Sequence, residues 1–109
     1  MIAKDIYDKA LITLGYADSQ VFKDRAVVVI NQVYDDLSGV LEIEEYAPIK
    51  NLSSTVNLPD KICNNAMVFG VAEKLALGQG DGEQQQYYAI KYDQARIKIT
   101  RTDKVVLTI

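Results

Sequence analysis

The sequence predicts a mainly α-helical fold: a small bundle of about four helices with an extended arm at residues 42–57 and a C-terminal β-strand at residues 102–109. Three observations support this prediction. Apolar residues recur at helical spacing over most of the chain, the helical period disappears within the arm, and the last eight residues have strong β-propensity. With 109 residues the chain is long enough to bury one core, so we expect a single domain over residues 1–109.

The first predicted helix spans Ile2 to Leu14. Its apolar side chains fall on one face of a helical period, and most of its charged side chains fall on the other face. Gly15 follows as a natural C-terminal stop, because glycine adopts the left-handed cap conformation without strain. We therefore expect an amphipathic helix that ends at this glycine.

The second predicted helix is the longest. Asp18 or Ser19 offers an N-cap, and apolar residues then repeat at helical spacing over residues 22–41. Val27 and Val28 make the helix apolar over more than one stripe, which predicts a central helix packed on two sides. A buried β-strand is the alternative for the valine run alone, but the helical period extends well past that run.

The predicted arm and the predicted C-terminal strand raise a question of pairing. Pro48 interrupts the arm, and residues 49–58 alternate loosely, as an extended segment or a short hairpin would. A lone strand at residues 102–109 needs a partner. Residues 49–58 could supply that partner within the chain, or the strand could add to the sheet edge of a neighbouring subunit. Both pairings are open at this point.

The third predicted helix begins at Pro59 and Asp60. Proline is tolerated in the first turn of a helix, and an acidic residue there favours the positive end of the helix dipole. Gly70 costs about 1 kcal/mol relative to alanine in a helix interior, so we expect close packing to require it. Small residues on the same side also favour close approach of another helix. The period of this helix is outlined by Ile62, Ala66, Phe69, Ala72, Glu73, Ala76 and Leu77.

A glycine-rich turn at residues 78–82 separates the third helix from the fourth. Gly78 is expected to take the left-handed cap conformation, and Asp81 with Gln84 matches a capping box. A phosphate-binding loop is the alternative, but the turn lacks the lysine and Ser/Thr of a P-loop, and no strand precedes it. The fourth helix is expected from about Asp81 to Ile99, with its tyrosine hydroxyls in partly wet surroundings.

The composition argues against catalysis. The chain has no histidine, so the commonest general base and the commonest metal ligand are both missing. The adjacent carboxylates of Asp35 and Asp36, and of Glu44 and Glu45, would point in different directions on a helix and do not share a site. Cys63 lies among apolar positions, where a free cysteine behaves as a small buried hydrophobe. We therefore expect no enzyme, no cofactor and no metal site.

Net charge and hydropathy limit the range of partners. The formal charge is −3, with 12 basic and 15 acidic side chains, so the chain lacks the positive field that drives non-specific phosphate binding. Four charged residues within residues 1–15 exclude the uninterrupted apolar core of a signal peptide. No stretch approaches the length of a membrane span, so we expect no membrane partner.

The charges are unevenly distributed along the chain. Residues 33–48 hold five acids and no base, whereas residues 91–109 hold five bases and two acids. A heterologous, head-to-tail interface could use such polarity, because the basic surface of one subunit can meet the acidic surface of the next. Ordinary surface charge is the alternative, since isolated surface pairs contribute little.

The order of these elements resembles that of the head-tail connector, or adaptor, proteins of tailed bacteriophages. The resemblance covers about residues 1–99: a helix pair, an irregular arm, a helix with small residues, a Gly/Asp turn and a tyrosine-rich last helix. It rests on Leu58-Pro59-Asp60, Phe69-Gly70-Val71-Ala72, Leu75-Ala76, Gly80-Asp81, Gln86-Tyr87-Tyr88 and Tyr92 to Arg96.

This resemblance implies a structural virion protein that forms a homo-oligomeric ring beneath the portal, joins the capsid to the tail and extends the DNA channel. The implied partners are the portal protein and a tail or stopper protein, with DNA passing through the lumen without specific binding. The implied location is the virion neck, after assembly in the cytoplasm of the host bacterium.

In such proteins irregular arms and chain termini commonly make the contacts with the portal, the neighbouring subunit or the tail. The resemblance therefore makes the arm and the C-terminal tail the candidate interaction segments. The candidate residues are Glu44, Glu45, Ile49, Lys50, Leu52 and Val56 in the arm and Arg101, Lys104, Val105, Leu107 and Ile109 in the tail.

Three alternatives stand beside this hypothesis. One is a tail-completion or neck protein of the same kind of virion. Another is a helix-turn-helix module that binds DNA, although the second helix offers only Lys23 and Arg25 near its start. The third is a small helical regulatory domain unrelated to virions.

Overall fold

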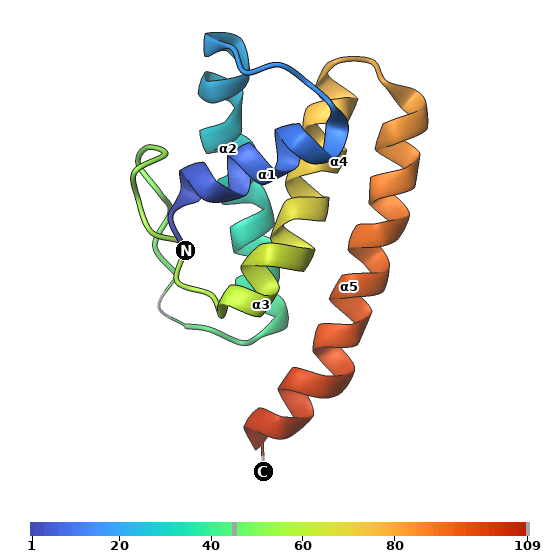
Figure 1. Cartoon of the computed structure of the whole chain (residues 1–109). Helices are drawn as coiled ribbons and strands as arrows, with labels where there is room; N and C mark the ends of the chain where they lie inside the picture. Colours follow the sequence, from blue (N-terminus) through green and yellow to red (C-terminus); the bar gives the residue numbers. More distant parts are fainter. Residues whose placement is uncertain (45, 109) are drawn as a thin grey trace.

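The computed structural model describes the backbone of residues 1–44 and 46–108 and the side chains of residues 1–44 and 46–99. Three segments, α3, η1 and α4, follow one another without a break and form one rod, of which η1 is π-helical (Figure 1). The mainly helical bundle that the sequence predicts is confirmed. Its elements are α1 (Ala3–Leu14), α2 (Gln20–Val40), α3 (Asp60–Ile62), η1 (Cys63–Met67), α4 (Val68–Gly78) and α5 (Gly82–Thr108).

The ends of the first two helices match the predictions. Gly15 caps α1 in the left-handed conformation, with φ of 73°. Ser19 is the N-cap of α2, and its Oγ accepts a hydrogen bond of 3.1 Å from the backbone N–H of Phe22. Both signals depend on a few neighbouring residues, so the local sequence is sufficient to place them.

The helix at the centre of the bundle is α4, which contacts α1, α2 and α5. Gly70 explains how closely they approach. A Cβ atom at this position would lie 2.8 Å from Val33 Cγ1 on α2 and 2.9 Å from Tyr92 Cε1 on α5, closer than a Cβ contact can be. The predicted need for a glycine at this position therefore has a structural reason: α2 and α5 both touch the rod there.

The prediction that α2 is packed on two sides is wrong. Val28 is 58% exposed and Val27 is only half-buried, whereas the opposite side of α2 is buried. The central place belongs to α4 because its small residues admit neighbours on several sides, which the branched valines of α2 do not. The buried residues of α2 are Phe22, Ala26, Val29, Ile30, Val33, Tyr34, Leu37 and Ser38.

The turn between α4 and α5 differs from its prediction by two residues. Gly80, not Gly78, has the left-handed conformation, with φ of 71°, because α4 continues to Gly78. The predicted capping pair is confirmed. The backbone N–H of Gln84 donates to Asp81 Oδ1 at 3.4 Å, and its side-chain amide donates to Asp81 Oδ2 at 2.9 Å.

The arm pairs with the N-terminus of the chain, in the region of an isolated antiparallel bridge between Ile2 and Thr55. The backbone N–H of Ala3 donates to Ser54 O at 2.9 Å, and the arm carbonyls thereby accept from the first turn of α1. The prediction that the arm could pair with the C-terminal tail is therefore wrong.

The physical reason is that the first backbone N–H groups of α1 require hydrogen-bond acceptors from outside the helix. The first N–H groups of a helix have no partner inside the helix, and Ile2, the N-cap of α1, provides no side-chain hydrogen bond. Backbone carbonyls of the arm fill that role, since Lys4 N also donates to Leu52 O at 2.8 Å. In the opposite direction, Val56 N of the arm donates to Met1 O at 2.8 Å.

The predicted C-terminal β-strand at residues 102–109 is also wrong over residues 102–108, because α5 is helical as far as Thr108. Ile109 lies outside the described residues. Extending a helix adds one backbone hydrogen bond for each residue, whereas a strand here could not pair with the arm, since the arm is engaged with residues 1–4. Backbone hydrogen bonding therefore outweighs local β-propensity.

Candidate interaction surface

The outer face of α5 carries three exposed apolar side chains. Tyr87, Ile90 and Ile97 are 53%, 59% and 52% exposed and recur at helical spacing. The inner face of the same helix meets the core through buried Ile99 and through half-buried tyrosines and Ala95. One helix therefore presents apolar side chains both to its own chain and to the outside.

Aromatic and ionic contacts fix the inner face of α5 in place. The Tyr88 ring stacks on the Phe69 ring of α4, with centroids 6.2 Å apart. Arg96 makes two hydrogen bonds to the Asp36 carboxylate on α2, from Nε at 2.8 Å and from Nη2 at 3.1 Å. The Tyr92 hydroxyl donates to the same carboxylate. The outward direction of Ile90 and Ile97 is therefore set by anchors on the opposite face.

The Asp36 carboxylate is the electrostatic centre of this anchor. Its partial burial would by itself raise its pKa, but hydrogen bonds from Arg96 and Tyr92 outweigh burial, so the pKa of Asp36 lies below its ordinary value. Burial and the Asp36 carboxylate raise the pKa of the Tyr92 hydroxyl. The pair with Arg96 is over a third exposed on both sides, so solvent screens much of its attraction.

A second set of polar contacts holds the start of α5 against α1. Tyr16 donates a hydrogen bond of 2.6 Å to Asp81 Oδ2, and burial together with this bond raises the pKa of Tyr16 to about 12. Gln84 Nε2 donates to Leu14 O at 3.1 Å, and the Tyr88 hydroxyl donates to Thr13 O at 3.2 Å. These bonds satisfy carbonyls at the C-terminal end of α1.

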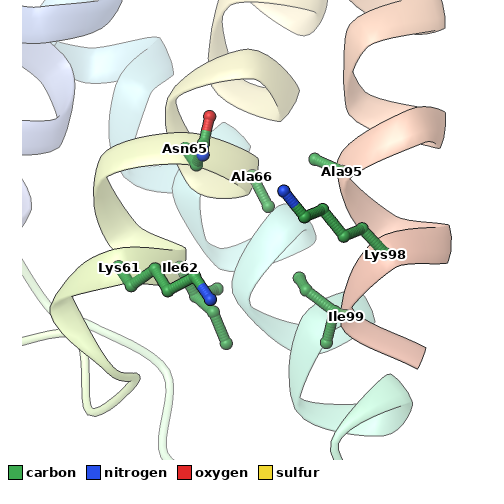
Figure 2. Close-up of a pocket in the computed structure, with 7 residues that line it drawn as sticks. All are labelled: Lys61, Ile62, Asn65, Ala66, Ala95, Lys98 and Ile99. Carbon is green, nitrogen blue, oxygen red and sulfur yellow. The ribbon is translucent and has the colours of Figure 1, made fainter. Parts of the chain in front are cut away.

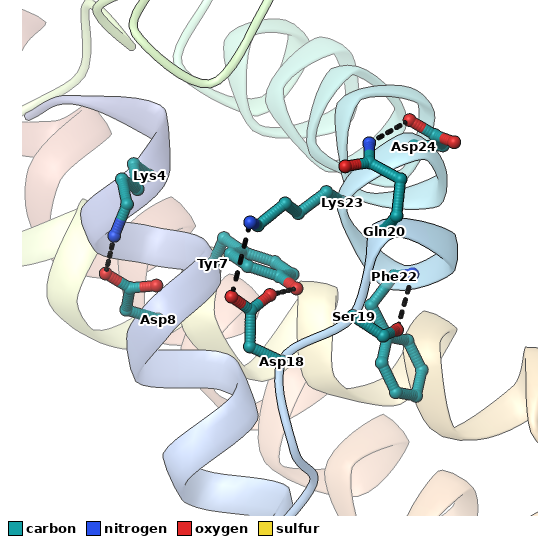
Figure 3. Close-up of polar contacts among 9 residues, drawn as sticks. All are labelled: Lys4, Tyr7, Asp8, Asp18, Ser19, Gln20, Phe22, Lys23 and Asp24. Atoms are coloured by element: carbon teal, nitrogen blue, oxygen red, sulfur yellow. Dashed lines mark hydrogen bonds and ion pairs between the residues drawn. The ribbon is translucent and has the colours of Figure 1, made fainter.

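A second apolar face lies on the outside of α2. Val21 and Val28 are 64% and 58% exposed, and Asp24 and Asp35 are exposed on the same helix. Figure 3 shows that Gln20 and Asp24 form a pair on α2, with Gln20 Nε2 donating to Asp24 Oδ1 at 2.8 Å. The outer face of α2 is thus apolar with acidic neighbours.

The basic residue at the start of α2 is turned back toward α1. Lys23 Nζ lies 3.4 Å from Asp18 Oδ2, and the Tyr7 hydroxyl donates to Asp18 Oδ1 at 2.5 Å (Figure 3). Burial and this hydrogen bond raise the pKa of Tyr7 to about 12. Lys23 therefore adds little positive charge to the outer face of α2, where a DNA-reading helix would need it.

The acidic and basic regions of the sequence meet inside the subunit. Asp36 comes from the acidic region and Arg96 from the basic region, and they are bonded to each other. The end of α2 and the C-terminal half of α5 lie at the same end of the molecule (Figure 1). Charge polarity along the sequence is therefore partly neutralised within one chain.

The arm residues predicted to mediate interactions fall into two groups. Ile49 and Val56 are 5% and 0% exposed and belong to the core, so their side chains face their own chain. Asn31 on α2 holds the arm in place: its Oδ1 accepts from Ile49 N at 2.8 Å, and its Nδ2 donates to Ile49 O at 3.1 Å. Glu44 and Lys50 are exposed and available to a partner.

The other candidate interaction residues are Leu52, Glu45 and the five residues of the tail. Leu52 is half-buried against the core, and Glu45 lies outside the described residues. Four tail candidates lie on the helical backbone of α5, and their side chains are outside the described residues: Arg101, Lys104, Val105 and Leu107. Ile109, the fifth, lies outside the described backbone as well.

The sequence analysis did not identify the outer faces of α2 and α5 as exposed apolar surfaces. The signal was present as a second apolar stripe on each helix, Val21 with Val28 and Ile90 with Ile97. A second stripe is compatible with burial on two sides or with exposure on one. The packing of neighbouring helices decides between these, and the sequence of a single helix does not contain that information.

A small pocket lies between the start of the α3–η1–α4 rod and α5 (Figure 2). Ile62, Ala66 and Ile99 supply apolar walls, and the amino groups of Lys61 and Lys98 lie at its sides. Its volume is about 50 Å³, well below the roughly 300–1,000 Å³ typical of ligand pockets. The pocket can accept a small apolar group.

Two further properties concern the described part of the chain. Within residues 1–44 and 46–108, no helix is both long enough and apolar enough to cross a membrane. Among the side chains that the structure describes, no three His, Cys, Asp or Glu residues gather in a group that could hold a metal ion.

Comparison with protein-family models, with curated proteins and with solved structures finds no match to this chain.

Proposed function

We propose that this chain is a structural virion protein, a head-tail connector or adaptor that assembles as a ring beneath the portal of a tailed bacteriophage. In this role it joins the capsid to the tail and extends the DNA channel. Its partners are further copies of itself, the portal protein and a tail or stopper protein. Its place is the virion neck, after assembly in the cytoplasm of the bacterial host.

The observation that carries the proposal is the presence of two separate exposed apolar faces, on α2 and on α5. Apolar side chains that line up on one exposed helix face can mark a site of protein–protein contact, whereas singly scattered ones are normal on monomers. A subunit of a ring needs two different faces, because each subunit contacts the next through one face and the previous one through the other. Two such faces on one small chain therefore support a ring subunit.

The residues that carry the family resemblance also act together. Gly70 admits Tyr92, Phe69 stacks on Tyr88, and Asp81 caps α5, so these motifs make the contacts of one α4–α5 hairpin. This agreement supports a common fold, which is the part of the resemblance that packing residues can carry. The function remains the proposal.

Native mass spectrometry over a wide concentration range, at low and moderate salt, tests the proposal directly. We expect a closed oligomer of defined subunit number, and electron microscopy of the same sample should resolve a ring with a central channel. Duplex DNA added to the sample should bind weakly and without sequence preference, since the chain is acidic overall. A chain that remains monomeric at every concentration would contradict spontaneous ring assembly.

A further inference from the structure

The exposed apolar residues of α5 and α2 have matching spacing. Ile90 and Ile97 are separated by seven residues, and so are Val21 and Val28. Seven residues of helix rise about 10.5 Å, so each face presents two apolar side chains at the same separation along its axis. Two helices with these faces can place both isoleucines against both valines at once.

Lysines lie beside the α5 stripe and an aspartate lies beside the α2 stripe, and α5 also carries exposed Asp93 on the side of its stripe away from the lysines. On α5, Lys91 and Lys98 flank the isoleucines on one side, and Lys91 Nζ lies 5.5 Å from the centre of the Tyr87 ring. On α2, exposed Asp24 lies between the valines on one side of their stripe, and exposed Asp35 continues the stripe itself, seven residues after Val28. At about 100° of rotation per residue, Lys91 lies clockwise from the isoleucine stripe, whereas Asp24 lies anticlockwise from the valine stripe.

This handedness selects a direction of packing. When two helices face each other in parallel, the clockwise flank of one meets the anticlockwise flank of the other, so Lys91 of α5 meets Asp24 of α2. Within one subunit α2 and α5 both run from the end that carries the α4–α5 turn toward the opposite end (Figure 1). Rotation about an axis along these helices preserves that direction, as assembly of a ring requires.

We propose that the outer face of α5 in one copy packs in parallel on the outer face of α2 in the next copy, with Ile90 and Ile97 against Val21 and Val28 and with Lys91 beside Asp24. The contact is heterologous, so it can propagate from subunit to subunit. This inference rests on the proposed ring function and identifies the surfaces that would form the ring. An antiparallel contact between two α5 helices would instead bring lysines together.

A pair of single substitutions tests the contact. Val28→Asp disables the α2 face and leaves the α5 face intact, whereas Ile97→Asp does the reverse. Each variant alone should lose the wild-type oligomer and associate at least about tenfold more weakly. An equimolar mixture should form heterodimers, because one intact α5 face and one intact α2 face remain, and native mass spectrometry resolves these dimers if one variant is isotope-labelled.

A charge exchange tests the predicted direction. Asp24→Lys should weaken the oligomer by facing Lys91 with a like charge, and the double variant Asp24→Lys with Lys91→Asp should restore it. Both positions lie outside the core, so circular dichroism and thermal unfolding should show wild-type folding. Ile12→Asp is the matched control, because Ile12 is 80% exposed on α1 and lies outside the proposed contact.

The outcomes separate this inference from the proposed function. If the wild-type chain forms a ring and Val28→Asp forms the same ring, the inference is overturned while the ring proposal stands. If Val28→Asp assembles but Ile97→Asp does not, α5 packs on itself or elsewhere, and the inference is again overturned. A wild-type chain that is monomeric at every concentration overturns both. Heterodimers in the mixture support the α5-to-α2 contact.

Discussion

The two helices of the α4–α5 hairpin lie side by side but are covered very differently. Six of the eleven residues of α4 are buried against its neighbours, whereas Ile99 is the buried residue of α5 among its described side chains. The residue types explain this difference. Small residues let α4 accept neighbours on several sides, while the tyrosines and exposed isoleucines of α5 give it one face for the chain and one for solvent or a partner.

This difference separates stability from interaction. Substitutions in α4 should act on the folded monomer, because they alter close packing within one chain. Substitutions on the outer face of α5 should leave the monomer nearly unchanged, because they alter surface that the chain itself does not cover. The same type of change on the two helices should therefore have effects of different size.

The largest expected effect follows from truncating a core side chain of α4. Leu75 is fully buried, so Leu75→Ala should lower the free energy of unfolding by about 2–5 kcal/mol, through lost apolar burial and the cavity that remains. Ile97→Ala is the matched change on the outer face of α5 and should stay within about 0.5 kcal/mol. Urea unfolding of the monomer measures both, and equal losses would contradict the comparison.

The next effect concerns the glycine at which three helices meet. Gly70→Leu should destabilise the monomer by about 1–3 kcal/mol, because any Cβ there meets Val33 and Tyr92. Gly39 is the control: it lies on α2, and an added Cβ would meet nothing within 4 Å. Gly39→Ala should instead stabilise by about 0.5–1 kcal/mol. Thermal unfolding of both variants should give shifts of opposite sign.

A smaller effect is expected for the anchor between α2 and α5. Because the pKa of Asp36 is lowered in the folded state, its contribution is present above the unfolded value of about 3.9 and is lost as pH falls through the folded value. Asp36→Asn should remove this part of the acid dependence, by less than about 1 kcal/mol because the pair is partly exposed.

Urea unfolding from about pH 5 to about pH 2 measures this acid dependence. Asp35→Asn, at the exposed neighbouring position, is the matched control and should keep the wild-type slope. If the two variants behave alike, Asp36 does not hold α5 in the way that its hydrogen bonds to Arg96 and Tyr92 indicate.

The smallest effect on monomer stability is expected for a substitution on the exposed outer face of α5. Ile90→Gln should change the free energy of unfolding of the monomer by no more than about 0.5 kcal/mol, because the side chain is 59% exposed. Unfolding is measured at a concentration at which wild type and variant are both monomeric. A large loss would mean that the outer face of α5 supports the fold itself.

The success of sequence reasoning differed between local and non-local features. The stop at Gly15 and the capping pair at Asp81 were predicted correctly, and the N-cap at Ser19 was one of the two residues predicted for it, since each depends on residues close in sequence. The glycine cap after α4 was placed at Gly78 instead of Gly80, because a glycine-rich turn offers several positions with the same freedom.

The interaction residues were predicted less well than the helices. Ile49 and Val56 look like exposed alternating residues of an arm, but Asn31 and the N-terminal residues hold that arm against the core. The exposed face of α2 was predicted to be buried, and no role was assigned to the outer face of α5. In both cases the sequence records that a side chain is apolar but does not record which surface covers it.

By itself the sequence determined the helical class, the approximate spans of the helices before α5 and most of their ends, because backbone hydrogen bonding and capping in a helix join residues only a few positions apart. Only the tertiary structure decided that α4 is central, that the arm completes the start of α1 and that the tail continues α5 as far as Thr108. These outcomes depend on competition between distant segments for the same hydrogen bonds and the same apolar surface, and that competition is resolved only when the whole chain packs.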